Sequence, residues 1–475
     1  MPTKRIGIIG GGIAALATAY RLTQSSNDVA VTILEQDSQL GGLARSFKVA
    51  GLPVDMGPHR IFTEIPEIKE FLKDFLSDQW FLVKRRSQMF YKGGYFDYPI
   101  KVGGALKHLG LLTTMRFGVG AVLASLTGGR GAGADQTFDG VMKGAFGGPV
   151  YHELIMPYIK KVWKMDPADI DAEVARLRVS AGGLEKILRQ ALGREKSDDP
   201  SAVKEFYYLP NGFQDMVDKY TAVLDGRPVR WHTQARVVEV EQRSDGRVRV
   251  RWDGRGAQGN EEFDFCFSTI PVDDLIRMLT AHRPDDAALR AADSLRYLSM
   301  ILIYLIARKP RISANSWLYF PEPHIIFNRG YESKNFNPHI QSDNAVLCLE
   351  VTCYRGDSTW RRSDDDVAAQ VVREFCATGM LDPGDVAGTV VTRLTHAYPI
   401  LHRGYKKDLG VLWNYLREMP GLITLGRQGL FQHNNTDHSQ FMGFCAADLY
   451  RRSTSPSREW YDAEIKKFDH FRIVD

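Results

Sequence analysis

Apolar and polar positions at the start of the chain follow two different periods. Residues 5–9 form a short apolar run that ends at Gly10, and residues 29–34 form a second run that ends at Glu35. Between them, residues 13–22 repeat with the period of a helix and contain many alanines. A strand, a sharp turn, a helix and a second strand in this order predict one βαβ unit.

Blocks of helix and strand patterns follow along the rest of the chain. Residues 89–98 alternate around Gly93–Gly94, which predicts a hairpin. A final helix is predicted from about Ser439. Because strand, turn and helix patterns return late in the chain, we predict a nucleotide-binding domain assembled from separated stretches. The predicted units are the discontinuous domain 1–90, 205–290 and 390–465, a mainly helical cap region 91–204, and a strand-rich substrate domain 291–389.

Composition narrows the class of protein. A chain of 475 residues predicts two or more domains, and 44% hydrophobic with 25% charged residues is ordinary for a globular protein. A net charge of +4 argues against a nucleic-acid binder but leaves room for a local basic pocket that takes an anionic small molecule. The five cysteines form no Cys-x-x-Cys pair, and an apolar strand pattern begins almost at once. We therefore expect a reducing, cytoplasmic location.

One apolar segment approaches membrane-spanning length. Residues 109–126 contain Arg116 and three interrupting glycines. We therefore predict a buried or surface-docked helix there, and no transmembrane segment. The Gly/Ala-rich residues 128–135 that follow are expected to form a mobile loop, with a lid over the site and simple disorder as the two alternatives.

The glycines after the first predicted strand fit the pattern of a dinucleotide-binding turn. Gly10 allows the tight turn, Gly12 lets the backbone approach a pyrophosphate, and Ala15 permits close packing of helix and strand. Glu35 ends the second strand, where an acidic side chain accepts hydrogen bonds from ribose hydroxyls. The strand before the motif and the helix after it make a dinucleotide site the favoured interpretation over a purely structural turn.

A second glycine motif, residues 40–46 (LGGLARS), follows Glu35 closely. It resembles the second glycine motif of the amine oxidase superfamily of flavoproteins, which implies FAD as the cofactor. The family often has arginine directly after the glycines. Here Leu43 occupies that place, so Arg45 is the expected phosphate contact beside Gly42. The predicted fold class is α/β: a Rossmann-type FAD-binding domain of the GR2-like flavoprotein fold, with an inserted helical and β-sheet substrate domain.

Within that superfamily the chain resembles UDP-galactopyranose mutases over most of its length. The matching motifs lie in family order and are GPHRIF at 57–62 with His59, KVW at 161–163 with the later Arg176 and Arg178, FNR at 327–329, AYP at 397–399 with Tyr398, Gly426–Arg427, and NTDHS at 435–439.

The resemblance implies an activity and roles for particular residues. Mutases of this family interconvert the pyranose and furanose rings of a nucleotide-linked sugar through N5 of the reduced flavin, without net redox change. The implied substrate-binding residues are Arg329, which would fork onto the diphosphate, together with Tyr398, His433 and Trp163. His59 would contact the flavin near N5 or O4 and tune its reactivity. We expect catalytic roles for His59, Arg329 and Tyr398, an external reductant such as NAD(P)H as a possible partner, and no metal.

The closing motif is expected to hold the flavin ring. Asn435, Thr436 and Asp437 match cofactor-binding positions, as do Gly426 and Arg427. Asp437 or Thr436 would cap a helix that begins near Ser439. The positive end of that helix would then stabilise the anionic, reduced flavin.

Other interpretations remain open at this point. At His433 the bacterial mutases have a diphosphate-binding tyrosine, which leaves the sugar and the base unidentified. An oxidase or dehydrogenase of the protoporphyrinogen or amine oxidase type is the alternative, with Arg329 holding a substrate carboxylate. A non-catalytic flavoprotein is a third. The tyrosines at 91, 95 and 98 either line a ring-stacking pocket or pack on a core.

Overall fold

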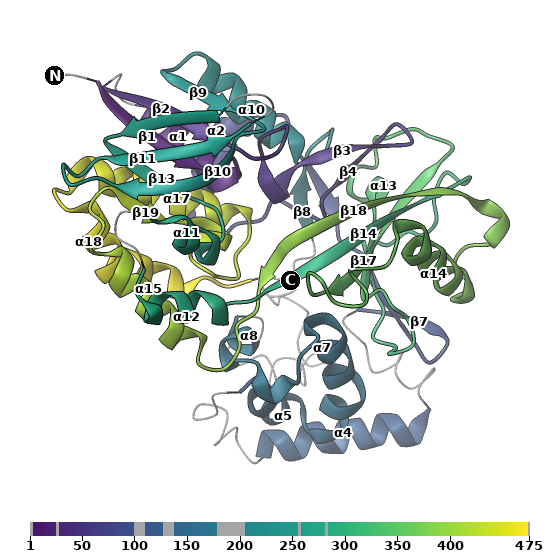
Figure 1. Cartoon of the computed structure of the whole chain (residues 1–475). Helices are drawn as coiled ribbons and strands as arrows, with labels where there is room; N and C mark the ends of the chain where they lie inside the picture. The colour runs from purple at the N-terminus through teal and green to yellow at the C-terminus, as the bar shows by residue number, and fades with distance from the viewer. Residues whose placement is uncertain are drawn as a thin grey trace.

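The computed structural model describes residues 3–24, 28–98, 110–126, 137–177, 205–254, 258–280 and 284–473. Two large sheets organise these residues, with a group of helices below them in Figure 1. The predicted loop at 128–135 and Arg178 lie outside the described residues.

A five-stranded parallel sheet contains the predicted βαβ unit. Strand β1 (Lys4–Ile9), helix α1 (Ile13–Leu22) and strand β2 (Val29–Leu34) confirm the elements expected from the apolar pattern. Ile6 and Ile33 are fully buried, because α1 packs on the sheet and strand β12 (Gln258–Phe263) also lies against β1. The strand order is β19-β13-β1-β2-β9, in which β9 (Val229–His232), β13 (Phe265–Ser268) and β19 (Leu422–Thr424) come from distant parts of the chain.

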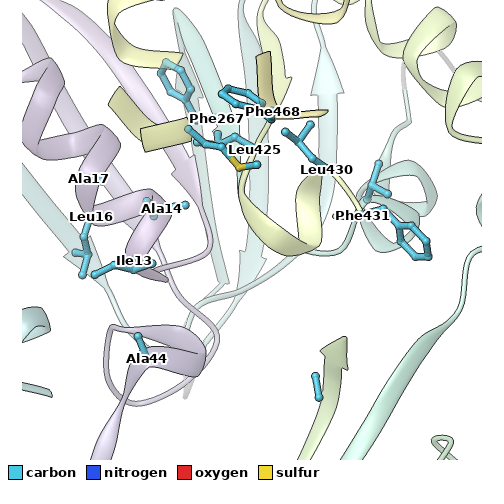
Figure 2. Packing of buried hydrophobic residues seen from close by; sticks show 14 of the residues in the cluster. Ile13, Ala14, Leu16, Ala17, Ala44, Phe267, Leu425, Leu430, Phe431 and Phe468 are labelled. Carbon is cyan, nitrogen blue, oxygen red and sulfur yellow. The ribbon is translucent and has the colours of Figure 1, made fainter. Parts of the chain in front are cut away.

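Helix α1 packs against helix α17 (Thr436–Arg452) from the far end of the chain. Small residues permit this contact, because a Cβ on Gly443 would lie 2.7 Å from the carbonyl oxygen of Ala14. Figure 2 shows Ala14 and Ala17 on α1, with Ala44 of the second glycine motif beneath the first turn of the helix.

The other elements on this side are α2 (Pro66–Leu76), α10 (Gln214–Asp225), α11 (Val272–Met278), α12 (Asp286–Ser294), α15 (Tyr405–Leu416), α16 (Gly426–Gly429), α18 (Pro456–Asp462) and the three-stranded sheet β10 (Arg236–Gln242), β11 (Val248–Asp253), β12 (Gln258–Phe263).

The second large sheet has seven strands in the order β18-β14-β17-β16-β15-β6-β7. Its long central strand β14 (Tyr297–Ala307) is almost entirely buried. Strands β6 (Ser87–Tyr91) and β18 (Val386–Pro399) also belong to this sheet, so it extends beyond the predicted boundaries at 291 and 389. Its other members are β7 (Gly94–Asp97), β15 (Trp317–Tyr319), β16 (Arg329–Glu332) and β17 (Ala345–Cys353), with α13 (Ser333–Phe336) and α14 (Asp364–Ala377) beside them.

Asp55 links two small strand pairs to the seven-stranded sheet. It ends β4 (Leu52–Asp55), which pairs with β3 (Ser46–Val49). Its carboxylate accepts hydrogen bonds from Ser46 Oγ (2.5 Å), Tyr208 OH (2.6 Å) and the Phe213 amide (3.1 Å), and its carbonyl accepts one from Tyr331 of β16 (2.7 Å). Burial raises the pKa of Asp55 to about 6 despite these donors. Tyr208 belongs to the small antiparallel pair β5 (Phe81–Lys84) and β8 (Glu205–Tyr208).

The helical region lies below the two sheets in Figure 1. Its described helices are α4 (Leu111–Leu126), α5 (Phe138–Phe146), α6 (Gly148–Val150), α7 (Met156–Trp163) and α8 (Ala172–Arg176), and a π-helical turn (Tyr151–Ile155) joins α6 to α7. No helix in the described part of the chain has both the length and the hydropathy to cross a bilayer. Helix α4 is the described helical part of the predicted segment 109–126.

Candidate functional site

The turn between β1 and α1 is shaped by its glycines. Gly10 has a φ of +92°, which favours glycine, and Ala15 is fully buried. Gly12 precedes the first turn of α1 with an ordinary φ of −74°. A Cβ at Gly12 would meet no protein atom within 4 Å, so this face of the backbone is open. An open backbone at a helix N-terminus fits a pyrophosphate group, whose charge the first amides stabilise.

The second glycine motif adjoins the first. The Gly41 amide donates to the Gly11 carbonyl (2.8 Å), and a Cβ on Gly42 would lie 3.1 Å from Gly12 Cα. The guanidinium of Arg45 lies 2.8 Å from the Asp37 carboxylate. Its Nε is buried without a hydrogen-bond partner among the described residues. The two motifs thus form one surface, and the phosphate contact predicted for Arg45 remains a prediction.

Glu35 ends β2 next to this surface. Its two oxygens accept hydrogen bonds from the amides of Gly11 (2.6 Å) and Asp37 (2.8 Å). Burial raises the pKa of Glu35, and the two amides act in the opposite direction. Each carboxylate oxygen can accept a second hydrogen bond, so the predicted ribose contact is compatible with this geometry.

The closing motif differs from its prediction in one respect. Helix α17 begins at Thr436, and Asn435 is the N-cap residue, whose amide donates to Nδ1 of His438 (3.0 Å). The capping role predicted for Asp437 or Thr436 is therefore wrong, because both lie inside the first turn. Asp437 Oδ1 is buried without a hydrogen-bond partner among the described residues.

The three cofactor motifs meet around the first turn of α1. A Cβ on Gly426 would lie 3.1 Å from the Cβ of Ala14. The segment Gly426–Arg427 therefore lies beside the glycine turn, and α17 starts a few residues later. The surface of glycines fits the diphosphate of a dinucleotide, and the start of α17 fits an anionic ring at its far end.

Two arginines flank His59, which follows the turn at Gly57. Burial and the positive charges of Arg427 and Arg329 lower the pKa of His59 to about 3. The imidazole is therefore neutral at physiological pH. Its Nδ1 is buried and has no hydrogen-bond partner among the described residues, which leaves this atom suited to contact a bound ligand.

Arg427 carries a charge that no carboxylate among the described residues balances by an ion pair. Its guanidinium donates to the carbonyls of Ala397 (3.2 Å) and Asn434 (2.6 Å) and lies 5.1 Å from the ring centre of Tyr398. Burial lowers the pKa of Arg427. None of the described ion pairs includes it. An uncompensated buried cation favours an anionic ligand.

Arg329 is held from behind by a buried acid. In the register of β16 and β17, Arg329 lies opposite Glu350. Its Nε and Nη2 contact the Glu350 carboxylate at 2.9 to 3.1 Å. The side chain of Glu350 is 2% exposed and that of Arg329 is 23% exposed. Glu332, three residues further along β16, instead accepts hydrogen bonds from the amides of Ile312 and Ser313.

Two tyrosines that were not predicted also face Arg329. The charge interactions of Arg329 include those with Tyr158 of α7 and Tyr319 of β15, as well as with Tyr398. The ring centres of Tyr158 and Tyr319 are 6.5 Å apart, and Tyr98 lies 4.9 Å from Tyr319. Burial raises the pKa of Tyr158, which keeps its hydroxyl a donor. We call His59, Tyr158, Tyr319, Arg329, Tyr398 and Arg427 the arginine-tyrosine site; all six are half-buried.

Trp163 and His433 form a stacked pair behind this site. Their ring centres are 5.0 Å apart at an angle of 11°, and the ring of Trp163 is 6.2 Å from that of Tyr398. His433 Nε2 lies 2.7 Å from the Pro399 carbonyl, and the residue is 1% exposed. His433 thus supports Trp163 and the end of β18. A phosphate contact by His433 stays a prediction. The burial of the side chain argues against such a contact.

The predicted tyrosine cluster of the hairpin splits in two. The turn between β6 and β7 is Lys92–Gly93, both with positive φ, as expected for a two-residue hairpin. Tyr95 packs on Phe90 (5.0 Å) and donates to Thr378 (2.6 Å). Tyr98 instead extends the row of rings that begins at Tyr158. Packing is therefore the role of Tyr95, and only Tyr98 borders the site.

The neutral state of His59 predicts a pH effect on stability. In the unfolded chain, the imidazole of this histidine gains a proton below about pH 6.5. In the folded protein it gains one only near its lowered pKa of about 3. The folded state therefore loses stability as the pH falls from 7 to 5, by about 2 kcal/mol. His59→Gln removes this loss. In urea unfolding, the free energy of unfolding of the variant relative to that of the wild type should therefore be higher at pH 5 than at pH 7. The same replacement at the exposed His324 is the matched control, and an equal gain there would contradict the assignment.

Comparisons with known proteins agree with this geometry. The family profile of the flavin containing amine oxidoreductases matches residues 132–407, and that of the NAD(P)-binding Rossmann-like domain matches residues 8–75. Coproporphyrinogen III oxidase of Mycobacterium leprae (strain TN) is 24% identical over 405 residues, which are 81% of this chain and 86% of that protein.

Two solved structures show the same fold. A reduced UDP-galactopyranose mutase is 22% identical, with a TM-score of 0.80 over 99% of this chain and 100% of the other. A putative protoporphyrinogen oxidase from Exiguobacterium sp. 255-15 is 17% identical, with a TM-score of 0.75 over 95% of this chain and 99% of the other. The predicted Rossmann-type α/β flavoprotein fold is thereby confirmed. Since the first profile covers more than half of the sequence, the chain belongs to the flavin containing amine oxidoreductase family, and its cofactor is FAD.

Proposed function

We propose that this flavoenzyme acts on an anionic, nucleotide-linked sugar and interconverts its pyranose and furanose rings. The observation that carries the proposal is the arginine-tyrosine site, in which Arg329 and Arg427 flank a neutral His59. The two guanidinium groups are matched by a single carboxylate, that of Glu350, which pairs with Arg329. The half-buried site therefore has an excess of positive charge. A diphosphate matches that charge, and its oxygens match the tyrosine hydroxyls around Arg329.

Each residue of the site has a definite task in this reaction. Glu350 holds Nε and Nη2 of Arg329, which fixes the plane of the guanidinium and leaves Nη1 for the substrate diphosphate. Tyr158 and Tyr398 interact electrostatically with Arg329, and we assign their hydroxyls as further donors to the same group. Arg427 balances the charge of the diphosphate when it separates from the sugar, and His59, being neutral, orients a ligand through its unsatisfied Nδ1. Reduced FAD, when bound, supplies through N5 the nucleophile that the anomeric carbon requires.

An oxidase is the second candidate. The relative from Mycobacterium leprae carries the name coproporphyrinogen III oxidase and covers most of this chain. In that case the excess positive charge of the site would hold substrate carboxylates, and the flavin would accept a hydride. We favour the mutase because the tyrosines around Arg329 add donors suited to the many oxygens of a diphosphate.

One assay separates the two candidates. The purified holoenzyme, with its flavin reduced by dithionite, is incubated anaerobically with UDP-galactose and with a panel of other nucleotide sugars, and products are separated by chromatography. We expect ring-isomerised product with reduced flavin, none with oxidised flavin, and no lasting change in the flavin spectrum. Sustained hydrogen peroxide release with coproporphyrinogen III, and no isomerised sugar, would overturn the proposal.

A further inference from the structure

Helix α4 exposes an apolar face of unusual size. Of the eleven large hydrophobic side chains exposed among the described residues, six lie on this one helix. The most exposed are Leu112 (84%) and Leu111 (62%). Spacings of three or four residues place the set on one side of the helix. We call this set the α4 apolar face: Leu111, Leu112, Met115, Val119, Val122 and Leu123.

The rest of α4 rests on the protein. A Cβ at Gly120 would lie 2.7 Å from Cδ of Pro149, so the helix approaches α6 closely at this glycine. Arg116 forms an ion pair with Glu153 of the π-helical turn. The helix also contacts α5. In Figure 1, α4 runs along the lower edge of the molecule, on the far side of the helical region from the five-stranded sheet. One side of the helix therefore packs along the protein, and its apolar face points outward.

The charge of the surrounding sequence indicates what covers this face. Residues 98–134 contain no aspartate or glutamate, and besides Arg116, which pairs with Glu153, they contain Lys101, Lys107 and Arg130. Basic residues thus occur on both sides of the apolar helix along the chain. A second copy of this chain, paired through α4, would bring like charges together. An anionic lipid surface accepts the apolar side chains and attracts the cations at the same time.

We propose that α4 is an interfacial helix that docks this enzyme on membranes containing anionic lipid. The helix lies in the plane of the surface, with the α4 apolar face among the upper acyl chains. Its 16 residues lie along the protein, and no described helix is suited to span a bilayer. The chain runs from α6 through the π-helical turn into α7, which carries Tyr158. Docking would therefore place the helical region that supplies Tyr158 to the arginine-tyrosine site against the membrane. This holds for either of the two reactions considered above.

Vesicle binding tests the proposal. Holoenzyme is mixed with vesicles of phosphatidylcholine alone or with added phosphatidylglycerol, and the bound fraction is measured by flotation. We expect binding to the phosphatidylglycerol vesicles that weakens at high salt, and at least tenfold weaker binding to phosphatidylcholine alone. Leu112→Glu with Val119→Glu should reduce binding to the anionic vesicles at least tenfold, while FAD content and thermal midpoint stay unchanged.

A matched control distinguishes the helix from a general effect of added charge. Leu82→Glu with Leu289→Glu makes the same change at two exposed positions elsewhere, and its binding should equal that of the wild type. Absence of binding to either vesicle by the wild type would overturn the proposal. So would a wild-type dimer in light scattering that the α4 variant converts to a monomer, because the face would then be a contact between copies of the chain.

Discussion

Gly12→Val should yield a folded protein that no longer binds FAD. The replacement places its Cβ where no protein atom lies within 4 Å, and φ at this position suits any L-residue. We therefore expect the variant to fold. The cofactor diphosphate, by contrast, needs close approach to this backbone, and the valine methyls occupy that approach. We expect FAD affinity to fall at least a hundredfold, which corresponds to about 3 kcal/mol.

The measurement is the ratio of flavin absorbance to protein after purification, together with titration of the apoprotein with FAD. Gly410→Ala is the matched control, because a Cβ at Gly410 in α15 also meets no protein atom. That variant should keep full FAD content and gain slightly in stability from the higher helix propensity of alanine. Full FAD content in Gly12→Val would mean that the diphosphate lies elsewhere.

Removing the charge of Arg329 should strongly weaken substrate binding and leave the cofactor in place. Arg329→Met alone would strand the buried Glu350 carboxylate without a partner, which costs about 3–5 kcal/mol of stability. We therefore pair it with Glu350→Gln, which removes both charges together. Loss of a charged contact to a desolvated diphosphate costs about 2–5 kcal/mol, so UDP binding should weaken at least thirtyfold.

Calorimetric titration with UDP and the flavin absorbance ratio report the two effects separately. The matched control is Arg393→Met with Asp364→Asn, which removes an arginine-carboxylate pair between β18 of the same sheet and helix α14, with a distance of 2.7 Å. The control pair should bind UDP as the wild type does. Loss of FAD in the Arg329 variant would show that this arginine serves the cofactor, and unchanged UDP binding would remove it from the substrate site.

The dinucleotide turn was predictable because its causes are local. Gly10, Gly12 and Ala15 act within a single turn of chain, and Glu35 ends the next strand directly. Short-range patterns of this kind determine the backbone before distant contacts form. The start of α17 was missed by three residues because the capping box at Asn435 uses His438 in the place where glutamate or glutamine is usual.

The arginine-tyrosine site was predictable only in part. Arg329 and Tyr398 were found through their motifs, whereas Glu350, Tyr158 and Tyr319 were not. Glu350 faces Arg329 through the register of β16 and β17, and no local pattern reveals which residues oppose each other across two strands. Tyr158 comes from a helix of a different region, and tyrosine in a helix is more often a packing residue.

The contact of α1 with α17 has a consequence for how the protein is made. Strand β1 emerges from the ribosome well before its neighbour β13 and the next strand, β19, which come from residues 265–268 and 422–424, and the helix that packs on α1 follows at 436–452. Contacts between such distant residues close slowly during folding. The newly made N-terminal segment therefore has its glycine turn long before it has the platform on which FAD rests. We therefore expect flavin to load late in biogenesis, and a chain that terminates before α17 to retain the cofactor poorly.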